Sequence, residues 1–136
     1  MVTAVDSSVI FDLLTGHPAH GPRSRQALER CVTQGRVLAC EVVWAEVAAH
    51  FPSRAATRQM MTELGIEFSP LTMPAALEAG RTWKSYRERG GSRTRVAPDF
   101  LIGAHASLEA DQLLTRDHGF YRSYFKRLTL LVPTTP

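Results

Sequence analysis

The sequence has little cysteine, no long apolar run and no segment that reads as a targeting signal. Its two cysteines, Cys31 and Cys40, are too few for a disulfide framework and lack the spacing of metal ligands, so both are predicted to be reduced packing residues. No apolar run approaches the roughly 20 residues of a membrane span. Met1 is followed directly by a predicted strand instead of a signal peptide. These absences predict a cytoplasmic protein that does not enter a membrane.

Lysine is also scarce, because only Lys84 and Lys126 among the 16 basic residues are lysines, at a net charge of +3. The planar guanidinium of arginine suits phosphate better than the point charge of lysine, which favours a nucleic-acid surface. A genome that prefers arginine codons explains the same bias equally well. The composition leaves both interpretations open.

Length and composition predict one globular domain spanning residues 1–136. The chain is 44% hydrophobic and 21% charged, and it is long enough to bury an ordinary core. We find no internal repeat, low-complexity tract or linker that would divide it.

Short apolar runs alternate with segments of helical periodicity along the chain. Such alternation is typical of an α/β protein, with a parallel sheet covered by helices on both faces. The predicted strands are 2–5, 37–40, 66–68, 112–115 and 128–132. The predicted helices are one that Ser7 or Ser8 caps, then 24–34, 41–51, 54–64, 74–89, 97–108 and 119–125.

Four acids are predicted to meet at the carboxyl edge of this sheet, where ligands bind in open α/β folds. Asp6 ends the first strand, and Asp117 follows the fourth. Glu46 lies about one turn into the helix that leaves the second strand. Asp99 is in the first turn of the helix that leads into the fourth strand, and such a helix must begin at the same edge. Each acid alone is more often a surface or capping residue, so their coincidence carries the prediction.

Carboxylates that share a crevice repel each other, and each raises the pKa of the others unless a cation lies between them. Oxygen ligands without histidine or cysteine suit Mg²⁺ or Mn²⁺. Such a metal activates water and neutralises charge on a phosphodiester, which makes a nuclease the natural reaction class. Zinc hydrolysis is not expected, since the sequence has no His-x-x-x-His pair.

At four motifs the chain resembles the PIN-domain ribonucleases of the VapC toxin type. The motifs are VDSSVIFDLL at 5–14, VWAEV at 43–47, PDFLIGAHA at 98–106 and LLTRDHGFY at 113–121. By this resemblance the acidic, metal-binding quartet is Asp6, Glu46, Asp99 and Asp117, supported by the hydroxyls of Ser8 and Thr115.

The resemblance also implies a fold, an activity and partners. The fold is a PIN-like three-layer α/β/α sandwich with a central parallel five-stranded sheet in the order 3-2-1-4-5. The activity is that of a Mg²⁺- or Mn²⁺-dependent endoribonuclease, the toxin of a toxin–antitoxin pair. The partners are RNA, a second copy in a homodimer, and a cognate antitoxin that blocks the crevice. The RNA cut and the number of metal ions stay open.

Basic residues flank the predicted site. Arg93 and Arg95 lie in the loop before Asp99, and Arg116 precedes Asp117, so these three arginines are candidate RNA contacts. The alternative for the basic surface is an ordinary solvated face.

Other candidates have weaker support. Glu41 is expected to cap its helix or to lie at the rim, and His118 is a possible substrate contact. His105 is expected to be a core or interface histidine, and Asp12 a structural acid. The alternative function is a non-catalytic PIN-fold module that binds RNA or a partner protein. A phospho-acceptor receiver domain is excluded, because the positions of its acceptor aspartate and its lysine hold Ser69-Pro70 and Val132-Pro133.

Overall fold

The computed structural model describes residues 1–91 and 97–133, and strands alternate with helices along them as predicted. The strands are β1 (Val2–Val5), β2 (Arg36–Ala39), β3 (Ile66–Phe68), β4 (Gln112–Leu114) and β5 (Thr129–Leu131). The helices are α1 (Ser7–Leu14), α2 (Gly21–Gln34), α3 (Glu41–Ala48), α4 (Arg54–Glu63), α5 (Met73–Glu88), α6 (Ala97–Glu109) and α7 (His118–Tyr124). None of the described helices has both the length and the apolar composition that spanning a membrane requires.

The strands form one parallel sheet in the order β3-β2-β1-β4-β5, which confirms the predicted order. β1 is the central strand and pairs with β2 and β4. The strand ends are level, since Val5 lies opposite Leu114 and Ala39 lies opposite Phe68. All the carboxyl ends therefore share one edge, where the chain leaves each strand.

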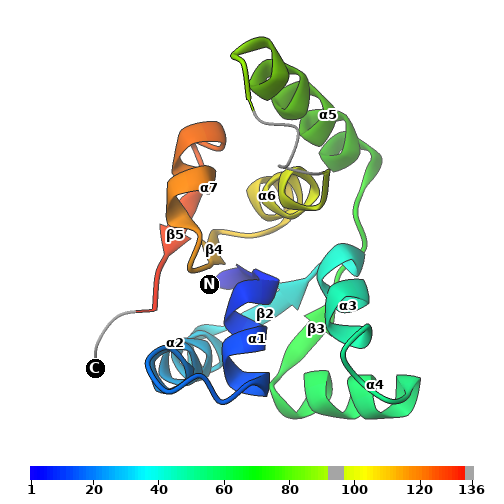
Figure 1. Ribbon diagram of the computed structural model, residues 1–136, viewed down its shortest axis with the longest axis vertical. Helices are drawn as coiled ribbons and strands as arrows, with labels where there is room; N and C mark the ends of the chain where they lie inside the picture. The colour runs from blue at the N-terminus through cyan, green and yellow to red at the C-terminus, as the bar shows by residue number, and fades with distance from the viewer. Residues whose placement is uncertain (92–96, 134–136) are drawn as a thin grey trace.

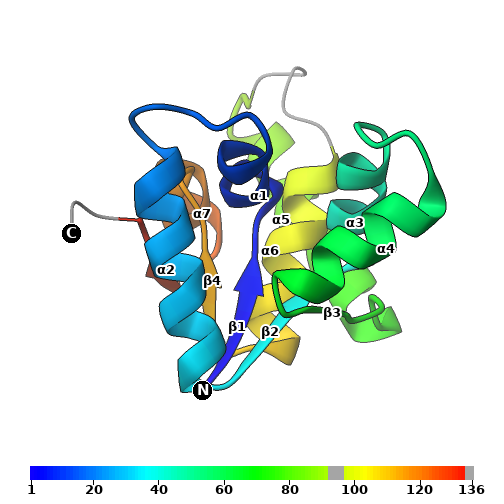
Figure 2. The same ribbon diagram turned by 90° about the horizontal axis from the view of Figure 1, so that it is seen from below.

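Helices cover both faces of the sheet and complete the predicted three-layer sandwich. In Figure 1, α5, α6 and α7 lie on one side of the strands, and α1, α2 and α4 lie on the other. Figure 2 shows β1 and its neighbours passing between α2 in front and α6 behind. The helices exclude solvent from both faces, so β4 is buried along its whole length and β1 from Thr3 onward. This burial explains why the strands appear as continuous apolar runs in the sequence.

One close approach at the amino edge requires glycine. A Cβ on Gly35 would lie 2.0 Å from the carbonyl oxygen of Met1. The same oxygen accepts the backbone amide of Arg36 at 3.2 Å, which sets β2 beside β1. Any larger residue at position 35 would push the two strands apart.

The helix starts differ from the predictions by one residue at α5 and α7, and more substantially at α2 and α1. α2 begins at Gly21 and not at Ser24, because Pro22 is compatible with the first helical turn. α1 begins at Ser7, with Asp6 as its N-cap residue and no side chain capping it. The predicted serine cap is therefore wrong, since the Ser7 and Ser8 hydroxyls donate to carboxylates instead.

Candidate active site

Asp6 lies at the centre of the carboxyl edge and is only 5% exposed. Its backbone amide donates to the carbonyl of Leu114 at 2.9 Å, which extends the pairing of β1 with β4 by one residue. Its Oδ2 accepts hydrogen bonds from Thr115 Oγ1 at 2.7 Å and from Ser8 Oγ at 3.1 Å. Two hydroxyls thus fix the orientation of a carboxylate that the fold has removed from water.

Glu46 reaches the same edge from α3. Its Oε1 accepts a hydrogen bond from Ser7 Oγ at 3.2 Å, which joins α3 to the first turn of α1. The sequence predicted Ser7 only as a helix cap, because a contact between positions 7 and 46 leaves no pattern in the neighbouring residues. The half-buried Asp99 approaches from the first turn of α6.

These three acids lie close enough to influence one another's charge. The pKa of Asp6 is raised, mainly because burial disfavours its charge, and the negative charge of Asp99 raises it further. The pKa of Glu46 is raised by burial first and then by the charges of Asp6 and Asp99. Hydroxyl donors lower both pKa values but do not offset the burial. The site therefore stores repulsion that a cation would relieve.

Asp117 is connected to this group through Thr115. The Thr115 hydroxyl accepts the backbone amide of Asp117 at 2.9 Å while donating to Asp6, so one side chain holds both acids in register. Ser8 Oγ also accepts the backbone amide of Arg116 at 3.3 Å. The structure thus brings Asp6, Glu46 and Asp99 together and places Asp117 at the end of the adjoining β4.

Arg116, a predicted RNA contact, has a partner inside the protein. Its Nε lies 2.7 Å from Oδ2 of Asp12, whose side chain is 3% exposed, and the same oxygen accepts Ser24 Oγ at 2.6 Å. The ion pair joins the segment between Thr115 and Asp117 to α1 and α2. Asp12 is a structural acid, as expected, while its pairing with Arg116 was missed because the two lie far apart in the sequence.

The donor atoms fit Mg²⁺ or Mn²⁺ better than zinc or copper, because they are oxygens only. Among the described residues, no three histidine, cysteine, aspartate or glutamate side chains are gathered closely enough to hold a metal ion. Mg²⁺ commonly uses one or two carboxylates and keeps several waters, with a substrate phosphate completing its shell. The residues present are compatible with that mode of binding.

The remaining candidates fall in several places. Arg93 and Arg95 lie outside the described residues. Glu41 does not cap α3, so that prediction is wrong; its carboxylate accepts the Leu71 amide at 2.9 Å and 3.1 Å instead. His105 is a buried core histidine that bonds Ser69 Oγ at 3.0 Å, and burial lowers its pKa. His118 is exposed at the start of α7.

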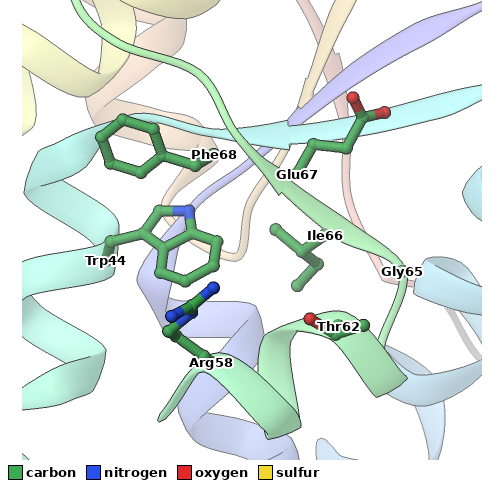
Figure 3. Close-up of a pocket in the computed structure, with 7 residues that line it drawn as sticks. All are labelled: Trp44, Arg58, Thr62, Gly65, Ile66, Glu67 and Phe68. Atoms are coloured by element: carbon green, nitrogen blue, oxygen red, sulfur yellow. The ribbon is translucent and has the colours of Figure 1, made fainter. Parts of the chain in front are cut away.

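Figure 3 shows a separate hollow of about 660 Å³ along the outer edge of β3. The rings of Trp44 and Phe68 meet edge to face at its margin, with their centroids 5.6 Å apart. Its carboxylate, Glu67, forms an ion pair with Arg36 at 3.1 Å. None of the four predicted acids lines this hollow, so it is distinct from the candidate site.

Comparisons with known proteins agree with this fold. The model of the PIN domain family matches residues 3–126. No curated protein sequence matches the chain.

Solved structures with a similar fold cover nearly the whole chain. A chain of VapBC2 from Rickettsia felis, bound to a promoter DNA fragment, has a TM-score of 0.75 at 17% identity, covering 97% of this chain and 98% of that one. A chain of VapBC-1 from nontypeable Haemophilus influenzae has a TM-score of 0.74 at 18% identity, covering 99% and 100%. A chain of a toxin–antitoxin complex from Klebsiella pneumoniae has a TM-score of 0.70 at 18% identity, covering 98% and 99%. At these identities the likeness concerns the fold.

Proposed function

Because the chain belongs to the PIN domain family, we propose that it is a metal-dependent endoribonuclease and the toxin of a toxin–antitoxin pair. The observation that carries the proposal is the convergence of Asp6, Glu46 and Asp99 from β1, α3 and α6. Their mutual repulsion persists in a largely buried setting. Among the described residues, no cation is paired with Asp6 or Glu46, whereas a fold that kept them only for structure would pair them, as it pairs Asp12.

Asp6, Glu46, Asp99 and Asp117 would form the binding site for Mg²⁺ or Mn²⁺, with one or two of their carboxylates bound directly and the others acting through waters. When bound, the metal would neutralise phosphodiester charge and promote ionisation of a water molecule. Thr115 and Ser8 keep the Asp6 carboxylate in one orientation, and Thr115 also fixes the backbone before Asp117. Such positioning prepares the site before substrate enters, so little reorganisation accompanies the reaction.

The proposal of a toxin with a cognate antitoxin draws on the assemblies in which similar folds occur. The Klebsiella pneumoniae structure is a toxin–antitoxin complex, and the Rickettsia felis and Haemophilus influenzae structures are VapBC assemblies. We infer that this chain likewise has a cognate antitoxin, which blocks the crevice, and by the family resemblance that it forms homodimers. A reading frame for such a partner next to its gene would support this role.

Cleavage of RNA tests the enzymatic part of the proposal. Purified chain freed of any partner should cut RNA with Mg²⁺ or Mn²⁺ and not with EDTA. Asp6→Asn and Asp99→Asn should each lower the rate by about 1,000-fold, because each removes charge that the metal needs. Gel analysis of labelled RNA measures both effects.

The matched control is Asp111→Asn at the opposite edge of the sheet. Asp111 Oδ2 accepts the Val2 amide at 2.7 Å, an interaction that the asparagine oxygen can keep. This variant should cut at the wild-type rate. Metal-independent cutting, or full activity of Asp6→Asn, would instead favour a non-catalytic PIN-fold module that binds RNA or a partner protein.

A further inference from the structure

A second hollow, of about 310 Å³, lies between α5 and the C-terminal end of α7. Residues 78, 81, 82, 85 and 89 line it from one face of α5, and residues 123, 124, 126 and 127 close it from the other side. Four of these side chains are basic and come from two segments far apart in the sequence, namely Arg81, Arg89, Lys126 and Arg127.

These four cations are not neutralised by the fold. Within the part of the chain that the structure describes, none of their side chains joins an ion pair or a side-chain hydrogen bond. Glu78 is the one carboxylate among the described lining residues. Four cations beside a single carboxylate create a positive potential, and a polyanion would be attracted to it.

The hollow also lies close to the acidic site. Tyr124 lines it, and the Tyr124 ring packs on the ring of Phe100, the residue after Asp99, with centroids 6.4 Å apart. The helix α7 begins directly after Asp117 and is only 7 residues long, a rise of about 10 Å. A strand bound at the carboxylates can therefore extend along α7 to the four cations.

We propose that this basic hollow binds the sugar–phosphate backbone of single-stranded RNA on one side of the cleaved bond. The inference rests on the proposed function and adds a substrate-binding surface to it. Contacts to the sugar–phosphate backbone do not depend on base sequence, and they position the strand.

The test compares two variants of equal charge in an Asp6→Asn background, which prevents cutting. The hollow variant carries Arg81→Gln, Arg89→Gln, Lys126→Gln and Arg127→Gln. The control carries Arg25→Gln, Arg30→Gln, Arg54→Gln and Arg58→Gln, on α2 and α4 at the other end of the molecule in Figure 1. All eight side chains are exposed, so both proteins should fold. Fluorescence anisotropy with labelled oligouridine, at several salt concentrations, measures binding.

The hollow variant should bind at least about tenfold more weakly than the control. Its dependence on salt should also flatten by about 0.7 in log–log slope for each RNA phosphate that the protein no longer neutralises. Replacing the three arginines by lysine should largely preserve binding, since the charge remains. If the hollow variant and the control bind alike, the cations are only solvated surface and the proposal is wrong. If the parent itself binds no RNA, the proposed function fails together with it.

Discussion

Two buried acids at the start of the chain are treated in opposite ways by the fold. Asp12 is 2% exposed and is matched by Arg116 at 2.7 Å and Ser24 at 2.6 Å. Among the described residues, the carboxylate of Asp6, which is 5% exposed, receives hydroxyl and backbone amide donors but no cation. Burial raises its pKa, and the charge of Asp99 raises it further. We infer that one buried charge is compensated inside the protein and that the other awaits a bound cation.

We infer from this difference, without reference to activity, that Asp12 is a structural acid and Asp6 a functional one. Burying a carboxylate is costly unless it is paired, so an unpaired one persists only where it has another use. The two acids are also connected, because Arg116 lies between Thr115 and Asp117 in the chain. The ion pair of Asp12 with Arg116 holds in place the segment 115–117, which contacts Asp6 through Thr115.

The largest effect is expected from breaking the compensated pair. Arg116→Met leaves the Asp12 charge buried without its cation and should lower the free energy of unfolding by about 2–3 kcal/mol. This figure is below the value for a fully buried pair, because the arginine side chain is 35% exposed. Denaturant titration measures the change.

The matched control for this loss is the double variant Asp12→Asn with Arg116→Met. It leaves no buried charge and should recover part of the stability, which a double-mutant cycle would report as coupling between the two positions. If the two changes are instead additive, the ion pair contributes nothing and Asp12 is not the compensated acid of the comparison.

A smaller effect is expected at Thr115, the residue that precedes Arg116 in the chain and contacts Asp6. Thr115→Val removes the donor to Asp6 and the acceptor of the Asp117 amide, so RNA cleavage should fall by about 10- to 100-fold. Thr115→Ser keeps the hydroxyl and should recover most of the activity. The control is Thr57→Val, because Thr57 is also buried but bonds within α4. Equal activity of Thr115→Val and wild type would show that the hydroxyl positions nothing.

The sequence predicted the sheet well because its information is local. Apolar runs, the proline in the first turn of α5 and the glycines after α2 and α5 mark the elements, and the acids at strand ends follow from parallel topology. The strand order itself came from resemblance to a family. The end of α3 was placed too late, because residues 50 and 51 bond three positions back, in tighter turns than an α-helix.

What the sequence could not show are contacts between distant positions. Glu41 binds the Leu71 amide, Ser7 binds Glu46, and Asp12 pairs with Arg116. Each of these side chains has an equally good local use as a cap or a surface charge, so periodicity favours the local interpretation. Only the folded chain shows which acids have cations and which do not.

The smallest effect is expected at Glu46, which lies beside Asp6 in the candidate site. The raised pKa of Glu46 means that the folded protein binds a proton there more tightly than the unfolded chain. Stability is therefore lost as the pH rises from the ordinary glutamate value of 4.5 through the folded value, and it stays lower at neutral pH. Glu46→Gln removes this penalty and keeps an oxygen for the Ser7 hydroxyl.

The melting temperature of metal-free Glu46→Gln should therefore exceed that of wild type at neutral pH and low salt. The gain should be about 2 °C, because the half-exposed side chain is partly screened by water. It should vanish below pH 4.5, and it should shrink with salt or Mg²⁺, which screen or bind the remaining acids.

Glu67→Gln provides the opposite control. Arg36 lowers the pKa of Glu67, so losing that charge should lower the melting temperature or leave it unchanged. If Glu46→Gln melts below wild type in EDTA, the Glu46 carboxylate is stabilised by a partner in the fold. Glu46 would then be a structural acid like Asp12.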